Sequence, residues 1–253
     1  PAKKQRREQS QAIATLSPDE QRPMFMSRMT ECLALETEAT TQANDQIDFV
    51  SQPADSDSLL STLLDLSEKG ALPGLRGTIS NIKKVPSGGK GSKGGKGGAK
   101  APASKLRSVV ISSSAARSAA QCGSIRYTEG GKAPDWNIAK LFAKHMKMSD
   151  QTDFLQRGIA TVGVGTAGRV LALGQSGALP MGDLESIVID VTPTVKGLTI
   201  LDDPASNKEL MEFLALTLSK RGTNFLKVVL YSDDGASAAV KTQPKAKKAK
   251  GGN

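Results

Sequence analysis

Three glycines in this chain stand at a spacing that can bring backbone N–H groups around a phosphate. They are Gly163, Gly165 and Gly168. G-x-G-x-x-G is a dinucleotide-binding fingerprint where it joins a strand to a helix. An apolar run precedes the glycines (159–164), and a helix-like run follows them (166–173). Because a helix N-terminus after a glycine turn attracts anions, the pattern predicts phosphate binding by this segment.

The surrounding residues alternate between strand-like and helix-like runs. Apolar, often β-branched runs predict strands at 106–111, 137–143, 159–164, 185–191 and 225–231. Helices are predicted between them at 113–121, 149–156, 166–173 and 207–221. Strands that alternate with helices predict an α/β fold of three layers, in which one parallel sheet is covered on both faces.

The N-terminal part of the chain has a different pattern. Apolar residues at helical spacing predict helices at 17–37 and 57–68. The polar stretch 38–53 between them is predicted to be a loop. We therefore expect a helical N-terminal extension over residues 1–82, ahead of an α/β domain over residues 105–232.

Positive charge is concentrated in two segments of a chain whose net charge is +9. Residues 69–128 hold twelve Lys or Arg and no acid, and residues 241–253 hold five Lys and no acid. Basic segments on an otherwise acidic chain indicate contact with nucleic acid. Aromatic residues make up 4% of the chain, which argues against RNA binding on an open platform of stacked rings. No apolar run approaches the ~18 residues of a membrane span, so no membrane partner is expected.

The glycine- and lysine-rich stretch cannot bury apolar surface. We expect residues 83–104 to form a flexible linker and residues 233–253 to form a basic, disordered tail. In this linker Lys90 and Lys96 are each followed by glycine. A phosphate-binding P-loop needs a hydroxyl after its lysine to hold Mg²⁺. The sequence therefore predicts no P-loop. Cys32 and Cys122 are far apart and do not form the pattern of a metal site, so we expect no metal, and we expect no cofactor.

Four blocks of sequence together resemble one protein family. They are 110–117 (Val-Ile-Ser-Ser-Ser-Ala-Ala-Arg), 140–147 (Lys-Leu-Phe-Ala-Lys-His-Met-Lys), 163–169 (Gly-Val-Gly-Thr-Ala-Gly-Arg) and 187–190 (Ile-Val-Ile-Asp). In this order they resemble the CMS ribosomal small-subunit proteins, which are shortened relatives of DEAD-box helicases. The resemblance covers about residues 105–232. The third block is similar to the Thr-Pro-Gly-Arg motif with which those helicases grip an RNA backbone, although Ala167 stands where the family usually has proline.

This resemblance implies one RecA-like domain without a P-loop, and no second such domain. It also implies a non-catalytic assembly factor of the small-subunit processome in the nucleolus. The implied partners are precursor ribosomal RNA or small nucleolar RNA and processome proteins, with no small-molecule substrate. DEAD-box ATPases need an Asp-Glu pair, whereas here Asp190 is followed by Val191, and Ser-Asp-Asp at 232–234 replaces their Ser-Ala-Thr. We therefore expect no ATP hydrolysis.

Candidate RNA contacts follow from the resemblance and from the position of the cations. They are Gly165, Thr166, Gly168, Arg169, Ser113, Ser114 and Arg117 in the α/β domain and Lys90, Lys93 and Lys96 in the linker. Parallel strands end at one edge of their sheet, where open α/β sheets bind ligands. Thr166, Arg169 and the turn at 112–116 are therefore expected to lie on the same edge.

Two other functions stay open. A nicotinamide-dependent dehydrogenase would hold pyrophosphate at the three glycines and ribose at Asp190, which follows Gly168 by close to the usual ~20 residues. Two strand–helix units precede these glycines, however, whereas the fingerprint normally opens its domain. The second alternative is a scaffold that binds only proteins.

Overall fold

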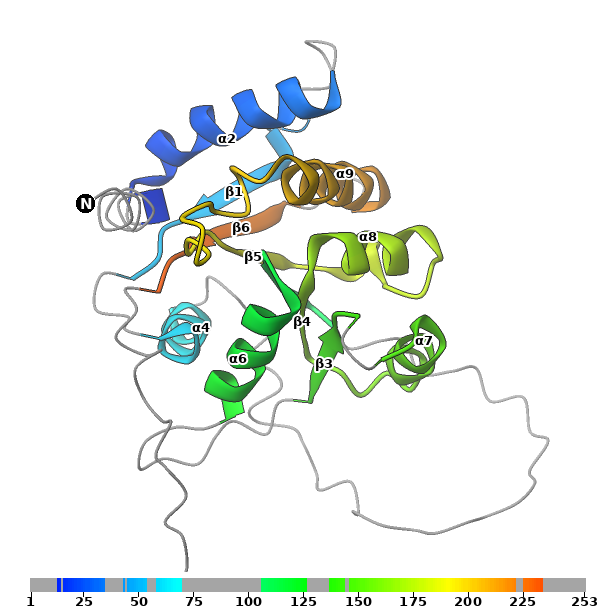
Figure 1. Cartoon of the computed structure of the whole chain (residues 1–253). Helices are drawn as coiled ribbons and strands as arrows, with labels where there is room; N and C mark the ends of the chain where they lie inside the picture. Colours follow the sequence, from blue (N-terminus) through cyan, green and yellow to red (C-terminus); the bar gives the residue numbers. More distant parts are fainter. Residues whose placement is uncertain are drawn as a thin grey trace, which may run out of the picture.

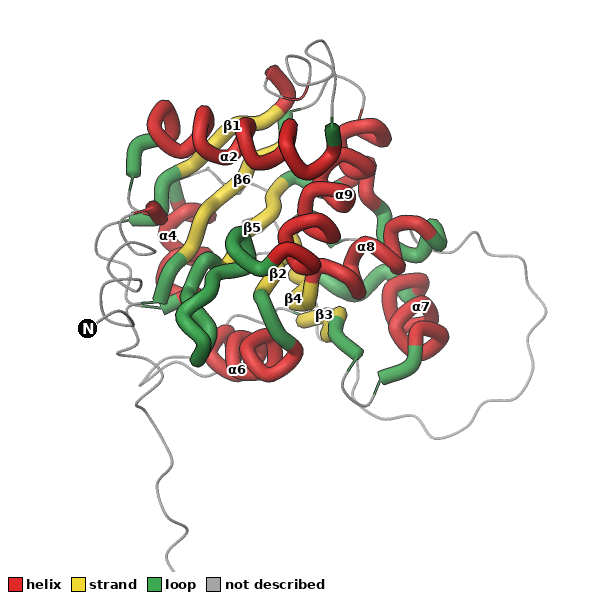
Figure 2. The backbone as a smooth tube through the Cα atoms, turned by 45° about the horizontal axis from the view of Figure 1, so that its top comes forward, coloured by secondary structure: helices red, strands yellow, loops and turns green. Residues whose placement is uncertain are grey.

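A parallel sheet of six strands forms the centre of the protein. The computed structural model describes residues 13–14, 16–34, 43, 45–53, 58–69, 106–126, 137–143, 146–221 and 225–233. The strands are β1 (Ile47–Val50), β2 (Ser108–Ser112), β3 (Ile138–Leu141), β4 (Val162–Thr166), β5 (Ser186–Asp190) and β6 (Leu226–Tyr231). Their order across the sheet is β1-β6-β5-β2-β4-β3 (Figure 2). All neighbouring strands pair in parallel.

Helices cover both faces of this sheet. They are α2 (Pro18–Leu33), α4 (Leu59–Glu68), α6 (Ala115–Arg126), α7 (Met148–Gln156), α8 (Ala167–Gln175) and α9 (Pro204–Arg221), with a short 3-10 helix η1 (Met181–Asp183). Helices α2, α8 and α9 lie on one face, α4 and α6 on the other, and α7 lies beside β3 (Figure 1). The predicted three-layer α/β fold is therefore confirmed, as are the five predicted strands and the six predicted helices, within a few residues at their ends.

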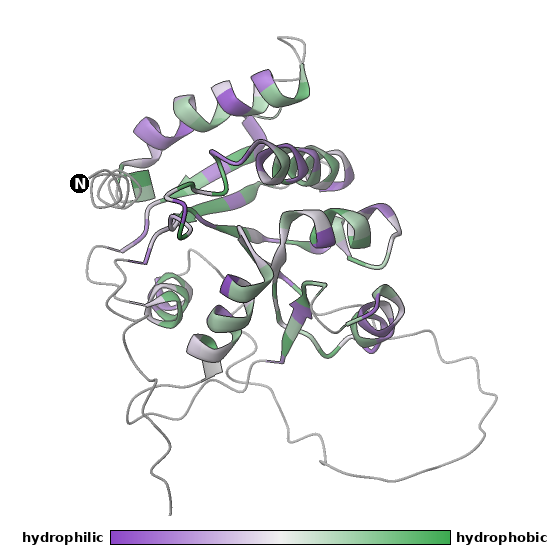
Figure 3. Ribbon diagram, in the orientation of Figure 1, coloured by the Kyte–Doolittle hydropathy of each residue, from purple (hydrophilic) through white to green (hydrophobic). Residues whose placement is uncertain are grey.

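Side chains of successive residues in the central strands enter two separate cores. Val109 and Ile111 of β2 pack on the α8 and α9 side, whereas Val110 packs on the α4 and α6 side. All three are fully buried. Burial on both faces explains the apolar run at the centre of these strands. Each such side chain contributes roughly 1.5–3 kcal/mol of transfer free energy. Figure 3 shows that the visible strands are mostly hydrophobic, with single hydrophilic residues between.

The sequence-based prediction of a loop over 38–53 is wrong, because residues Ile47–Val50 form strand β1. This strand pairs in parallel with β6, with Ile47 opposite Leu226. Its two buried residues, Ile47 and Phe49, alternate with half-buried ones. The sheet thus draws on the segment that was predicted to be a helical extension. Of the predicted linker no residue is described, and of the predicted tail only Asp233 is.

None of the helices in the described part of the chain is long and apolar enough to cross a membrane.

Candidate nucleic-acid interface

The parallel strands finish together at what we call the carboxyl end of the sheet. Ser112 at the end of β2 is paired with Thr166 at the end of β4. Asp190 at the end of β5 is paired with Tyr231 at the end of β6. Helix α8 starts directly after Thr166, and α6 starts at Ala115, after a turn of two residues that follows Ser112. The prediction that Thr166 and the turn at 112–116 share one edge is therefore confirmed.

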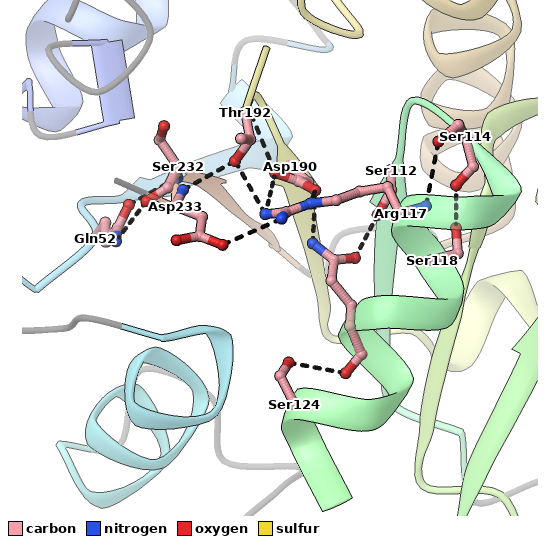
Figure 4. Close-up of polar contacts among 11 residues, drawn as sticks. Gln52, Ser112, Ser114, Arg117, Ser118, Ser124, Asp190, Thr192, Ser232 and Asp233 are labelled. Carbon is pink, nitrogen blue, oxygen red and sulfur yellow. Dashed lines mark hydrogen bonds and ion pairs between the residues drawn. The ribbon is translucent and has the colours of Figure 1, made fainter. Parts of the chain in front are cut away.

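Arg117, in the first turn of α6, organises this end of the sheet (Figure 4). Its Nε donates to Asp190 Oδ2 at 2.7 Å, and its Nη2 donates to Asp190 Oδ1 at 3.4 Å. Nη2 also reaches Thr192 Oγ1 at 3.1 Å, and Nη1 reaches Asp233 Oδ2 at 3.1 Å. A single guanidinium therefore joins segments that lie far apart in the sequence.

Further donors complete the hydrogen bonding of the Asp190 carboxylate, whose side chain is only 1% exposed. Gln121 Nε2 donates to its Oδ2 at 2.6 Å, and the Thr192 backbone N–H donates to its Oδ1 at 3.1 Å. Ser112 Oγ donates in turn to Gln121 Oε1. A buried charge is tolerated only when it is paired and hydrogen-bonded, and Asp190 meets both conditions.

A second side-chain amide holds the end of β6 in place. Gln52, which follows β1, donates from Nε2 to the Ser232 carbonyl oxygen at 3.2 Å and accepts from the Ser232 backbone N–H at 2.9 Å. The next residue, Asp233, donates its backbone N–H to Thr192 Oγ1 at 2.9 Å. These bonds place the Asp233 carboxylate against Arg117. Neither Gln52 nor Gln121 carries a sequence signal for this role, and sequence reasoning missed both.

The two carboxylates of the network keep Arg117 charged. Burial of the guanidinium lowers the pKa of Arg117, but the Asp190 and Asp233 carboxylates beside it raise that pKa by more, so the net shift is upward. Arg117 thus remains a permanent cation between two carboxylates. In the part of the chain that the structure describes, no three His, Cys, Asp or Glu side chains gather to form a metal site.

The glycine turn predicted between strand and helix is not present. Gly163 and Gly165 lie inside β4, and α8 begins at Ala167 with Thr166 as its N-cap residue. A Cβ atom on Gly165 would overlap the carbonyl oxygen of Leu141 in the neighbouring strand β3. These two glycines therefore permit a close approach of β4 and β3. Because the dinucleotide fingerprint needs its glycines in the turn itself, the dehydrogenase alternative loses its main support.

Gly168 and Arg169 both lie in the first turn of α8, but they face different neighbours. A Cβ on Gly168 would lie 2.6 Å from Glu209 Oε1, so the glycine makes room for a carboxylate of α9. Arg169 points the other way, and its Nη1 donates to Gln151 Oε1 of α7 at 3.1 Å. Thr166 is half-buried and makes no side-chain cap hydrogen bond. The start of α8 is thus acidic on its α9 side and basic on its α7 side.

The other candidate residues fall into three groups. Ser114 Oγ accepts the Arg117 backbone N–H at 3.2 Å, as an N-cap residue does, and Ser113 is half-buried beside it. Arg117 is a predicted RNA contact whose guanidinium is directed instead to Asp190, Thr192 and Asp233. Lys90, Lys93 and Lys96 lie outside the described residues.

The fold and this site define a class of parallel α/β protein in which an arginine neutralises the carboxylates at the carboxyl end of the sheet. The family CMS1, described as "U3-containing 90S pre-ribosomal complex subunit", matches residues 98–231, which is more than half of the chain. The protein belongs to this family, and the resemblance that the four sequence blocks indicated is confirmed.

Individual relatives match over shorter stretches. Protein CMSS1 of Xenopus laevis is 34% identical over 101 residues, covering 38% of this chain and 36% of the relative. Protein CMSS1 of Homo sapiens is 34% identical over 99 residues with the same coverage. The matched stretch thus spans about a third of each relative. Among solved structures, a DEAD box protein from the hyperthermophile Methanococcus jannaschii is similar, with a TM-score of 0.44 and 15% identity over 77% of this chain and 41% of that chain.

Proposed function

We propose that this protein is a non-catalytic assembly factor of pre-ribosomal particles that binds RNA at the carboxyl end of its sheet. The family description supports the particle, since it names a subunit of a U3-containing pre-ribosomal complex. The basic composition supports an RNA partner, which is precursor ribosomal RNA or small nucleolar RNA in this proposal. Processome proteins are the other proposed partners, and the nucleolus is the proposed location.

One observation carries the RNA-binding part of the proposal. The pairing of Ser112 with Thr166 places the starts of α6 and α8 at the same edge of the sheet, one helix on each face. Each helix start presents backbone N–H groups without helical partners and the positive end of a helix dipole. Arg169 adds a formal charge on the α7 side, whereas Glu209 borders the α9 side. A phosphate is therefore expected between the two helix starts, on the side of Arg169.

The non-catalytic part of the proposal rests on Arg117. The Asp190 carboxylate, which would hold Mg²⁺ in a helicase of the resembling class, accepts four hydrogen bonds from protein donors. The following residue is Val191 in place of the carboxylate that would position water. A protein that only binds RNA at this site needs neither a carboxylate to hold Mg²⁺ nor one to position water for hydrolysis.

Charge reversal at Arg169 tests the proposal. Arg169→Glu removes the cation and adds an anion at the third residue of α8, where a carboxylate favours the helix and keeps the fold. We expect weaker binding of single-stranded RNA, a salt slope smaller by about 0.7 because one phosphate is no longer bound, and failure to co-sediment with pre-ribosomal particles.

Arg157→Glu is the matched control, because Arg157 is exposed and caps the far end of α7. It makes the same change in net charge away from the carboxyl end of the sheet. If Arg169→Glu co-sediments with pre-ribosomal particles as well as the parent does, this end is not the RNA site. The scaffold that binds only proteins then becomes the better explanation.

A further inference from the structure

A cavity of about 270 Å³ lies along the outer side of β3, between this strand and α7. We call it the β3 cavity. Residues of β3 and its flank form one wall, and α7 with the residue Met146 forms the other. The lining residues that matter here are Asn137, Ile138, Lys140, Met146, Gln151 and Phe154. At ~30 Å³ per water the volume equals about nine waters, enough for a planar ring system but not for a folded segment.

Backbone hydrogen-bonding groups open into this cavity because β3 is an edge strand. The Asn137 carbonyl oxygen accepts from Thr161 N on the β4 side at 3.0 Å. Backbone groups alternate sides along a strand, so the N–H and C=O groups of Ile138 and Lys140 face outward. A C=O acceptor at Ile138 followed by an N–H donor at Lys140 matches the adjacent donor and acceptor atoms on the edge of a nucleobase.

Gln151 occupies the carbonyl groups of this edge strand that an added peptide strand would have to bind. Its Nε2 donates to the Lys140 carbonyl oxygen at 2.7 Å and to the Phe142 carbonyl oxygen at 3.0 Å. An added strand would need both carbonyls, and Lys140 itself is an exposed lysine of the kind that disfavours strand pairing. The β3 cavity therefore fits a compact planar group better than an extended chain.

The β3 cavity adjoins the proposed phosphate position through Gln151. The same side chain that caps β3 accepts from Arg169 Nη1 at 3.1 Å. Lys140 and Lys147 add exposed positive charge nearby, and Asp150 and Asp153 of α7 are the exposed acids of the same region. A nucleotide whose phosphate lies at Arg169 would thus have its base close to the β3 cavity.

We propose that the β3 cavity binds one unstacked base of single-stranded RNA, an inference that rests on the proposed function. The ring of Phe154 supplies the stacking surface, and Met146 supplies a polarisable thioether. The outward Ile138 C=O and Lys140 N–H bind the base edge. A single ring in a cavity agrees with the 4% aromatic content, which argues only against an open stacking platform.

The test compares two RNA probes, a single-stranded oligonucleotide and the same strand with its central bases removed. The parent protein is expected to bind the intact strand about 5- to 150-fold more tightly, the range for one stacked base. Phe154→Leu keeps the apolar volume but not the aromatic face, so this preference should disappear, whereas Phe154→Tyr should keep it. Phe225→Leu is the control, since Phe225 is 65% exposed and precedes β6, which lies four strands across the sheet from β3.

Thermal melting of each variant shows whether it is folded before its binding is compared. If the parent binds both strands equally while Arg169→Glu weakens both, the base pocket is overturned and the proposed function stands. If the folded parent binds neither strand, both are overturned. If the Lys140 amide gains protection from hydrogen exchange with particle proteins but not with RNA, the cavity belongs to a protein partner instead.

Discussion

Arg117 was predicted to contact RNA, but in the structure its guanidinium forms ion pairs with Asp190 and Asp233. Its planar guanidinium donates to two carboxylates and a hydroxyl at once, which a lysine ammonium on its flexible stem cannot reproduce. Asp190 and Asp233 are both nearly buried, at 1% and 7% exposure of their side chains. Arg117 therefore has a structural duty that would compete with any contact it made to RNA.

The stability of the fold is expected to depend strongly on this arginine. Arg117→Met leaves the two carboxylates without a counter-charge, and breaking a buried pair in this way costs about 3–5 kcal/mol of unfolding free energy. Asp233→Asn should cost less, because Asp190 keeps its arginine. Urea denaturation measures the unfolding free energy of both variants.

Lys208→Met is the control, since the ion pair of Lys208 with Glu212 is exposed and should contribute at most about 0.5 kcal/mol. Equal destabilisation by Arg117→Met and Lys208→Met would mean that the network does not hold the fold.

The sequence identified several residues of the site but not the contacts between them. Arg117 and Asp190 were both singled out, the first as an RNA contact and the second as a surviving helicase aspartate. Their ion pair joins residues that are 73 positions apart, and no local pattern encodes such a contact. Gln121 was missed for a related reason, because a buried glutamine in a helix has no signature until its partner is known.

At the scale of elements, the approach of β4 to β3 depends on a missing side chain. The Cβ of an alanine at Gly165 would meet the Leu141 backbone, which cannot move without disturbing the pairing of the two strands. This requirement explains the glycine more directly than phosphate binding does. It also indicates that the spacing of the three glycines reflects packing at Leu141 and Glu209.

We expect opposite effects from two glycine-to-alanine substitutions. Gly165→Ala should lower the unfolding free energy by about 1–3 kcal/mol, the usual cost of overpacking. Gly123→Ala in α6 should raise it by about 0.5–1 kcal/mol, because a Cβ there meets no atom within 4 Å and alanine favours a helix. Chemical denaturation of both variants checks the pair. If Gly165→Ala left the unfolding free energy unchanged, β3 would be held less tightly than its contacts indicate.

The elements that sequence predicted correctly are those buried on both faces. Strands β2 and β5 are buried throughout and have a run of three apolar, β-branched residues at their centre, so their type and position follow from the sequence alone. Strand β1 was missed because it has only four residues, includes Asp48 and follows a polar stretch. Its position is determined by pairing with β6, and Asp48 forms an ion pair with Lys227 of that strand at 3.2 Å. Such a partner lies too far along the chain for a local pattern to reveal it.

At the scale of the whole molecule, the two basic segments are joined to opposite ends of the sheet. Helix α4 follows β1 and runs back toward the end of the sheet at which the strands begin, which we call the amino end. Strand β2 also begins there. Residues 70–105 are therefore joined to the described part of the chain at the amino end on both sides. The residues after Asp233 are attached at the carboxyl end, beside Arg117. Lys241 is eight residues beyond Asp233, a contour of at most about 29 Å. Three strand spacings, ~14 Å, separate β6 from β4, so the tail lysines are within reach of the Arg169 side.

This arrangement predicts that the tail and the linker respond differently to the length of the RNA. On a single strand of about ten nucleotides bound at the carboxyl end, deletion of residues 241–253 should lower the slope of log K against log salt by about 0.7 for each phosphate that the tail had neutralised. Substitution of Lys90, Lys93 and Lys96 by alanine should change that slope little on the short strand and more on a longer one, because a longer strand can also reach the amino end. Filter binding at a series of salt concentrations measures the slopes. Lys220→Ala, at an exposed lysine in the last turn of α9, is the control for a loss of positive charge elsewhere. Equal flattening by both changes on the short strand would show that the segments are not separated by their points of attachment.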